Sequence, residues 1–196
     1  MINARTPDWN TLLQTLPHFR DRLVSGLDKL EILAGCRSLK MDHICIRLAD
    51  KAKVAVIQRE LEQIGETISE NIVAGRPIPI IQLSEPLAIG TWQTYGIELP
   101  YPKEKHAYAD GWEHVEFILP ATAHTAEALE EVFFAQFPHL DKNNLIERYQ
   151  YKMDEPHAED DQLPNPTICV KVSGIGIKFH TLSIQEVVGY EINLTP

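Results

Sequence analysis

Two histidines stand in matching contexts and are the side chains of this chain best suited to hold a metal ion. His43 follows Asp42 and His114 follows Glu113, and apolar residues then occupy every second position. Because side chains alternate between the two faces of a strand, each histidine heads the face opposite the apolar one. Imidazoles delivered by equivalent strands of a repeated unit are a common way to bind a divalent metal.

A carboxylate completes the candidate site. Glu98 lies on the polar face of a predicted strand at 91–99. With His43 and His114 it would form a triad with open coordination positions, as in catalytic Zn²⁺ and non-haem Fe²⁺ sites. Such a metal polarises a carbonyl, acidifies a bound water or accepts two substrate oxygens. The alternative is structural, since a histidine on a strand face more often only forms hydrogen bonds.

The last predicted strand adds two polar residues to the same face. His180 is either a fourth metal ligand or a residue at the rim of the site. Lys178 occupies the place in the second half of the chain that Glu98 occupies in the first. A buried ion pair between Glu98 and Lys178 is therefore an alternative to a metal, and Lys178 is otherwise a substrate-binding candidate.

Three further residues are candidates for substrate chemistry. Glu116 is a candidate general base, or else it pairs with Arg47. Arg47 is in turn a candidate for orienting an anionic group in the catalytic site. Arg76 lies in a predicted turn at 74–77 and is either a clamp for a carboxylate or phosphate or an ordinary surface arginine.

The elements that position these residues form a repeated pattern. Leucines at spacings of three and four predict helix over 8–34, with Pro17 starting a second helix or kinking the first and Gly35 ending it. The first half then predicts a strand at 42–48, a helix at 51–64 capped by Asp50, and strands at 66–70, 78–84 and 91–99. The second half predicts a strand at 113–119, a helix at 122–137, strands near 144–153, at 167–173 and at 175–180, and a short helix at 183–190 that opens with a Ser183/Glu186 capping box.

This pattern predicts an α+β fold. A βαβββ unit repeats with an offset of 71 residues (114 − 43), which gives two tandem modules in one cupped, mixed β-sheet. The expected organisation is an N-terminal helical cap at 1–40, a first module at 41–112, and a second module with the C-terminal helix at 113–196. Together they make one structural domain.

Composition restricts the class of protein. Apolar residues make up 44% and charged residues 23% of the chain, as in ordinary globular proteins. The net charge of −10 and the lack of a basic run argue against nucleic acid and anionic membranes as partners. No apolar stretch approaches the roughly 20 residues of a membrane span, and no signal peptide is evident. Three cysteines at unpatterned spacing indicate reduced thiols, so a cytoplasmic location is expected.

Several short segments resemble the bacterial YecM family over nearly the whole chain from about residue 8. That family in turn resembles the vicinal oxygen chelate superfamily, which includes glyoxalase I and the extradiol dioxygenases. The segments that carry the resemblance are Ser69–Asn71, Gly75–Ile78, Trp92–Gln93, Glu98–Pro100, Gly111–His114, Leu163–Thr167 and Ile177–His180.

The resemblance implies paired βαβββ modules around a divalent metal, with ligands from the first and last strand of each module. It assigns His43, Glu98 and His114 as ligands, and its fourth place falls at Lys178 or His180. A carboxylate is usual at that fourth place, so Lys178 departs from the superfamily pattern. The resemblance supplies no established reaction.

The expected function is therefore a metal-dependent isomerase, lyase or dioxygenase that acts on a small oxygen-rich substrate. Zn, Fe, Mn and Ni all suit such a ligand set. The alternative is a metal-free protein that binds a small ligand in the same cup. The chain would act as a monomer or a homodimer, because two modules can complete the cup alone.

Overall fold

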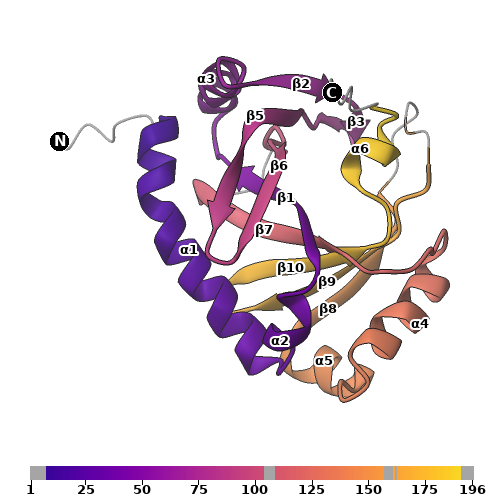
Figure 1. Cartoon of the computed structure of the whole chain (residues 1–196). Helices are drawn as coiled ribbons and strands as arrows, with labels where there is room; N and C mark the ends of the chain where they lie inside the picture. The colour runs from indigo at the N-terminus through magenta and orange to yellow at the C-terminus, as the bar shows by residue number, and fades with distance from the viewer. Residues whose placement is uncertain (1–7, 104–108, 157–160, 162, 191–196) are drawn as a thin grey trace, which may run out of the picture.

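The computed structural model describes residues 8–103, 109–156, 161 and 163–190, which form a large mixed sheet with helices around it (Figure 1). The helices are α1 (Trp9–Lys29), α2 (Leu33–Cys36), α3 (Lys51–Leu61), α4 (Ala126–Gln136), α5 (Lys142–Arg148) and α6 (Ile184–Val187). The strands of the large sheet are β1 (Lys40–Arg47), β2 (Gly65–Ser69), β5 (Ile80–Ile89), β6 (Trp92–Glu98), β7 (Gly111–Ile118), β8 (Gln150–Asp154), β9 (Thr167–Val172) and β10 (Ile175–His180). A separate hairpin is formed by β3 (Ile72–Val73) and β4 (Arg76–Pro77).

The strand order places the two halves of the chain side by side. The eight strands run β2-β5-β6-β1-β7-β10-β9-β8. β1 and β7 pair antiparallel at the middle of the sheet, and each is flanked by a parallel strand, β6 beside β1 and β10 beside β7. The order outward from the centre is therefore the same in both halves: last strand, preceding strand, then the strand that follows the helical segment.

The N-terminal segment forms one long helix. In α1 the residues that turn inward recur every three or four positions, including Leu12, Leu16, Leu23 and Leu27. Asp8 caps the helix by accepting a hydrogen bond from the Thr11 amide at 2.7 Å. Pro17 lies inside this helix, so the expectation that a second helix begins there is wrong. The helix ends at Lys29, and Gly35 belongs to α2 instead of ending the first helix.

Side-chain caps fix where the shorter helices begin. Asp50 accepts from the Ala52 amide at the start of α3, as predicted, and Thr125 accepts from the Ala128 amide at the start of α4. The predicted capping box is also present at α6, where the Ser183 amide donates to Glu186 Oε2 at 2.7 Å. Each such cap contributes about 1 kcal/mol.

One predicted strand is partly a helix. Residues 144–148 of the expected strand at 144–153 lie in α5, because Asp141 accepts from the Asn144 amide and caps a helical turn. Only the end of the predicted segment is extended, as β8. The physical reason is local: the cap starts a helix where the apolar pattern alone was ambiguous.

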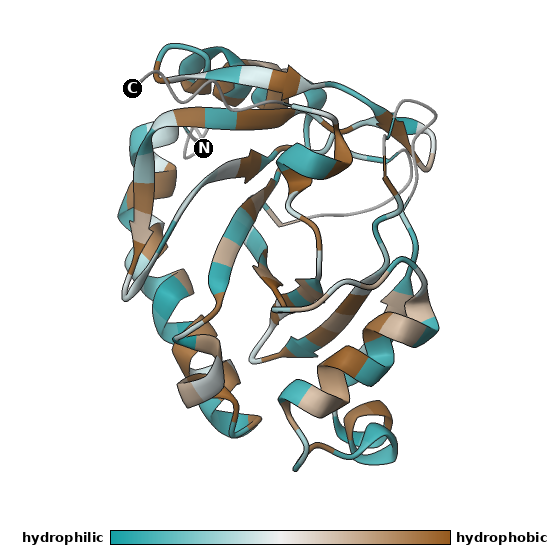
Figure 2. Ribbon diagram, turned by 45° about the vertical axis from the view of Figure 1, so that its right-hand side comes forward, coloured by the Kyte–Doolittle hydropathy of each residue, from teal (hydrophilic) through white to brown (hydrophobic). Residues whose placement is uncertain are grey.

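The apolar faces of the central strands pack against the helices. Phe179 of β10 stacks on Phe117 of β7 with ring centroids 6.0 Å apart, and Phe133 of α4 lies 5.1 Å from Phe179. Gly26 brings α1 close to the sheet, since a Cβ there would lie 2.9 Å from Val172. Figure 2 shows the corresponding alternation of apolar and polar residues along the strands and helices. This packing leaves the opposite face of the sheet for polar side chains.

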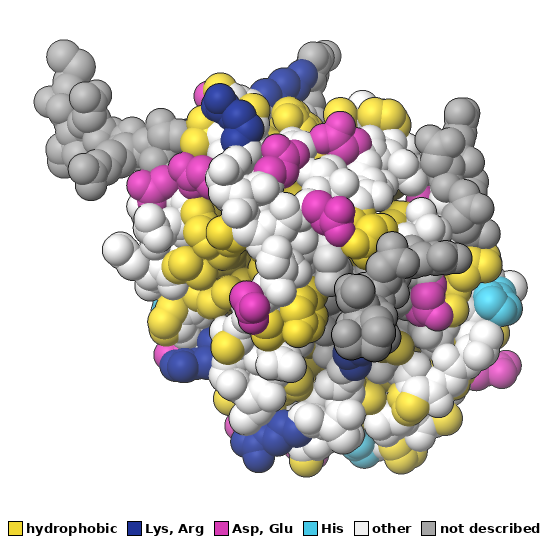
Figure 3. Space-filling model, turned by 45° about the horizontal axis from the view of Figure 1, so that its top comes forward, with side chains coloured by type: hydrophobic (Ala, Val, Ile, Leu, Met, Phe, Trp, Pro, Cys, Tyr) yellow, Lys and Arg dark blue, Asp and Glu magenta, His cyan; other side chains and the backbone are white. Residues whose placement is uncertain are grey.

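The described surface is acidic in places and apolar in others. Figure 3 shows Asp and Glu side chains dispersed among apolar and polar ones on the face that carries α3 and β2. Among the described residues no helix has the length and apolar character that a membrane span requires.

Candidate metal centre

Strand register brings the predicted polar residues onto one face of the sheet. His43 lies opposite Glu116 across the β1–β7 pair, and Cys45 lies opposite His114. On the other side of β1, Cys45 is the partner of Glu98 in β6. Residues opposite each other point to the same face, so these side chains from three strands converge.

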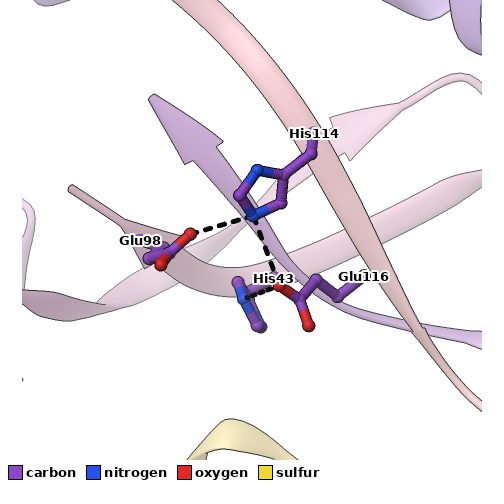
Figure 4. A group of neighbouring side chains, drawn as sticks. All are labelled: His43, Glu98, His114 and Glu116. Carbon is purple, nitrogen blue, oxygen red and sulfur yellow. Dashed lines mark ion pairs between the residues drawn. The ribbon is translucent and has the colours of Figure 1, made fainter. Parts of the chain in front are cut away.

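Four of these side chains can place their ligand atoms around one point (Figure 4). The atoms of His43, Glu98, His114 and Glu116 all lie within 4.8 Å of one another. His114 Nε2 is 2.9 Å from Glu98 Oε2 and 3.2 Å from Glu116 Oε1, and His43 Nε2 is 3.3 Å from Glu116 Oε1. Ligands about 2.1 Å from a metal are separated by about 3.0 Å in an octahedron and about 3.4 Å in a tetrahedron. These three separations lie close to that range.

Two of the four atoms are in ion-pair contact without a well-aligned hydrogen bond. Glu98 Oε2 and His114 Nε2 are buried and lie 2.9 Å apart, and neither atom forms a hydrogen bond of good geometry within the described part of the chain. Buried polar atoms are rarely left unpaired, because removing them from water costs about 1–3 kcal/mol. A cation between them would satisfy both atoms, so the residues present fit a divalent metal.

The acidic residue before each histidine orients its ring. Asp42 Oδ2 lies 2.8 Å from His43 Nδ1, and Glu113 Oε2 lies 3.3 Å from His114 Nδ1. A carboxylate that accepts from Nδ1–H leaves the Nε2 lone pair free for a metal, as in carboxylate–histidine–metal triads. These roles for Asp42 and Glu113 were not predicted, although the acidic residue before each histidine was the sequence signal.

Two β-bulges make this arrangement possible. Consecutive residues of a regular strand point to opposite faces, so Asp42 would normally point away from the His43 ring. The β1–β7 register shifts between Met41 and His43, which leaves Asp42 without a cross-strand partner, and again beside Ile46, which leaves Glu113 without one. A bulge of this kind turns neighbouring side chains toward the same face.

Glycines on the neighbouring strands make room for the rings. Gly96 of β6 is the register partner of His43, and Gly176 of β10 is the partner of His114. A Cβ at Gly96 would lie 2.7 Å from His43 Cβ, and one at Gly176 would lie 2.9 Å from His114 Cβ. Both distances are shorter than Cβ atoms tolerate, so each histidine depends on its glycine.

Lys178 contacts Glu116 and not Glu98. Its Nζ lies 2.7 Å from Glu116 Oε1, because β10 and β7 pair with Lys178 directly opposite Glu116. The alternative of a direct Glu98–Lys178 ion pair is therefore wrong, and the reason is this register. Burial raises the pKa of the Glu116 carboxyl, but the charges of Lys178 and His43 outweigh it and hold that pKa well below its usual range.

The carboxylates also control the charge of the histidines. Burial lowers the pKa of His43, but the Glu116 and Asp42 carboxylates more than offset it and raise that pKa to about 10. Without a metal, His43 is therefore a cation hydrogen-bonded between two carboxylates. Metal binding at this site must displace that proton.

His180 lies beside the four-residue cluster and belongs to a second group. Its Nε2 is 3.5 Å from Asp42 Oδ2 and its ring centroid is 5.9 Å from that of His43, so it groups with Asp42 and His43. Burial lowers the pKa of His180, which keeps its ring neutral. Glu116 takes the fourth place in the cluster instead, while a ligand role for His180 stays a prediction.

The two arginines lie away from the centre. Arg47 Nη2 is 2.6 Å from Glu113 Oε2, so its carboxylate partner is Glu113 and the alternative of an Arg47–Glu116 pair is wrong. Glu113 connects Arg47 to the His114 ring, since its Oε2 also lies 3.3 Å from His114 Nδ1. Arg76 donates to the Tyr101 carbonyl oxygen at 3.2 Å and does not line the cavity over the cluster. Roles for Arg47 and Arg76 toward a substrate stay predictions.

A cavity of about 90 Å³ opens onto the cluster. His43, Glu98, Glu116 and Lys178 form its floor, and Asn71 donates a hydrogen bond to Asp161 at 3.0 Å among the residues of its wall. The remaining described lining residues are Ser69, Val73, Ile78, Ile80, Pro156, Asn165, Thr167, Ile184, Val187 and Val188. A small molecule in this cavity would touch His43, Glu98 and Glu116 of the four-residue cluster directly.

The fold and the site together define an α+β protein with a buried two-histidine, two-glutamate cluster that could hold a metal ion. The chain belongs to the YecM family, whose model, described as YecM protein, matches residues 8–191. It is 35% identical over 188 residues to Protein YecM of Escherichia coli (strain K12), which covers 94% of this chain and 97% of that protein.

Two further similarities agree with this family. An uncharacterized protein of Haemophilus influenzae is 29% identical over 182 residues, covering 88% of this chain and 90% of that protein. A solved structure, Protein EC4020 from structural genomics, superimposes with a TM-score of 0.73 at 34% identity and covers 92% of this chain and 91% of that one. The names of these proteins state no reaction.

Proposed function

We propose that this protein binds one divalent metal ion through His43, Glu98, His114 and Glu116 and uses it on a small oxygen-containing substrate. The observation that carries the proposal is the convergence of four buried ligand atoms, with Asp42 and Glu113 behind the two rings. The reaction class would be isomerase, lyase or dioxygenase. Zn, Fe, Mn and Ni are all compatible with two imidazoles and two carboxylates.

The sheet supports a more specific fold assignment. Strand order repeats outward from the β1–β7 pair, and the two histidines lie at matching places beside matching glycines. This is the arrangement expected of tandem βαβββ modules in the vicinal oxygen chelate superfamily. We infer that the chain shares that architecture, with the site in its cup.

The chain's own residues have separate tasks in this scheme. Asp42 and Glu113 hold the histidine rings so that both Nε2 atoms face the centre. Lys178 lies at the cavity floor, where it can orient a substrate oxygen. A bound metal would supply Lewis acidity toward an oxygen of the substrate. We propose a small molecule as partner, with the chain acting as a monomer or homodimer in the cytoplasm.

A metal-free binding protein is the second candidate. It is favoured by Glu116 Oε1, which already lies 2.7 Å from Lys178 and within 3.3 Å of both histidine Nε2 atoms. With protonated histidines these contacts form a self-contained network of charges. In that case the cavity would bind its ligand without metal chemistry.

Elemental analysis separates the two candidates. The protein is purified without chelator or affinity metal, dialysed against Fe²⁺, Zn²⁺ and Mn²⁺ in turn, and compared with a His43→Ala, His114→Ala double variant. A His18→Ala, His124→Ala variant is the matched control, because both of those side chains are exposed. Near-stoichiometric metal in the wild type and control, lost in the first variant, supports the metal site. No metal in any sample supports the metal-free alternative.

A further inference from the structure

We propose that the molecule bound in the cavity is a small monocarboxylate, with its carboxylate held between the metal position and the ammonium group of Lys178. This inference rests on the proposed function and specifies its substrate class. It is carried by three observations: the position of Lys178, the balance of charge on the cavity floor, and the nature of the cavity wall.

Lys178 has hydrogen-bond donors at the cavity floor beyond the one that its contact with Glu116 uses. An ammonium group carries three N–H donors, and the contact with Glu116 Oε1 at 2.7 Å uses one. The side chain is 25% exposed and lines the cavity. It can therefore donate to a ligand oxygen while it remains paired with Glu116.

The charge on the cavity floor favours one negative charge on the ligand. On the floor, Glu98 and Glu116 together balance a divalent ion, and the ammonium of Lys178 is the positive charge beside it; the Asp161 carboxylate lies in the wall, where it accepts from Asn71. Asp42 is fully buried behind His43, where it accepts from the Ile184 amide at 2.9 Å, and does not line the cavity. A ligand carboxylate on the floor would therefore meet one cation beside a neutral centre, whereas a second negative charge on the ligand would meet the Asp161 carboxylate in the wall.

A phosphate fits this cavity less well than a carboxylate. Lys178 is the cationic side chain among its described lining residues, and Arg47 and Arg76 do not line it. Asp161 adds a carboxylate to the wall, where it accepts from Asn71. A phosphate dianion usually requires several donors or an arginine fork, whereas one ammonium and one metal suffice for a carboxylate.

The size and wall of the cavity limit the rest of the ligand. The cavity is small, at about 90 Å³, which favours a ligand of few heavy atoms. An apolar cluster of Ile80, Ile184 and Val187 forms part of the wall. This combination suits a short aliphatic substituent on the carboxylate.

The test uses isobutyrate as the probe and isobutyramide as its neutral counterpart. Binding is measured by calorimetry on metal-loaded wild type, Lys178→Met and Lys178→Arg, and the metal content of each sample is determined. Lys171→Met is the matched control, because Lys171 is an exposed lysine that does not line this cavity. We expect metal-loaded wild type to bind isobutyrate more tightly than isobutyramide. We expect Lys178→Met, at unchanged metal content, to bind isobutyrate at least tenfold more weakly than wild type does. Lys178→Arg and Lys171→Met should retain most of the affinity.

The outcomes separate this inference from the function on which it rests. Metal-loaded wild type that binds isobutyrate no better than isobutyramide overturns the monocarboxylate inference alone. The same holds if Lys178→Met binds isobutyrate as tightly as wild type does. Wild type that takes up no metal overturns the proposed function and this inference together.

Discussion

The two halves of the sheet share a scaffold and differ in charge at one position. Glu98 on β6 and Lys178 on β10 each lie two residues after the glycine that faces a histidine. The first half places a carboxylate there and the second an ammonium group. In the second half the carboxylate comes instead from β7, as Glu116, where the first half has Cys45.

This difference shows that one arrangement of strands can support two functions. The symmetric parts are the histidines, their glycines and the acidic residues on the bulges, and these position the rings. The asymmetric parts are Glu116 and Lys178, which lie 2.7 Å apart. We infer that the residues common to both halves position the metal, and that the residues that differ between the halves create a site for an anion beside it.

The largest effect on metal affinity is expected from replacing Glu116, the ligand that has no counterpart in the first half. Glu116→Ala should lower metal affinity by about a hundredfold or more, because it removes a ligand and leaves Lys178 unpaired beside the metal. Cys45→Ala changes the corresponding residue of the first half and should leave metal affinity nearly intact. Competition with a chelator measures both variants. Unchanged affinity in Glu116→Ala, or a loss in Cys45→Ala as large as that in Glu116→Ala, would contradict the asymmetry described here.

The orienting carboxylates should have the next largest effect. Asp42→Asn and Glu113→Gln keep the shape of the side chains but weaken acceptance from Nδ1, so each should lower metal affinity by about 10- to 100-fold. The same chelator competition measures the change. Glu130→Gln, at a carboxylate that pairs with Lys142 far from the cluster, serves as the control. Unchanged affinity in both site variants would show that the two carboxylates do not orient the histidine rings for metal binding.

Alanine substitutions at the two glycines test whether both histidines need the same space. Gly96→Ala should destabilise the fold by about 1–3 kcal/mol through overpacking against His43 and the Asp42 backbone. Gly176→Ala should cost less, since its closest contact, with His114 Cβ at 2.9 Å, is longer and no close backbone contact accompanies it. Urea unfolding followed by circular dichroism gives both values. The opposite ranking would contradict the packing described for β6 and β10.

The smallest effect is expected at the helices that follow β1 and β7. Asp50→Ala and Thr125→Ala each remove the N-cap of the helix in one half, α3 or α4, and each should cost about 1 kcal/mol. Neither should change metal content, because the caps lie outside the site. Thermal unfolding measures the loss of stability, and elemental analysis measures the metal content. A loss of metal in either variant would mean that the helices, and not the strands alone, position the cluster.

Much of the site could be predicted from strand alternation. His43, Glu98, His114 and Glu116 were placed on one face because their positions have the right parity, and the structure brings them together. The first-half helix was also predicted with its cap, since Asp50 is a local signal. Signals of this kind depend on neighbours in sequence.

What could not be predicted depends on partners far away in sequence. The bulges at Asp42 and Glu113 exist only because β1 and β7 pair in one register, and that register is not encoded locally. The alternative that pairs Lys178 with Glu98 is wrong for the same reason. Equivalence of the two repeats suggests Glu98 as the partner, whereas the β7–β10 register gives Glu116. The helix α5 is a different case, because its cap at Asp141 was available and was overlooked.

The most direct test of the central claim is an anomalous difference map from crystals grown with Zn²⁺, measured on both sides of the zinc absorption edge. The account predicts one strong peak about 2.0–2.2 Å from Nε2 of His43 and His114 and from a carboxylate oxygen of Glu98 and Glu116. No peak at this position, with the four side chains still in contact with one another and Glu116 still paired with Lys178, would contradict it.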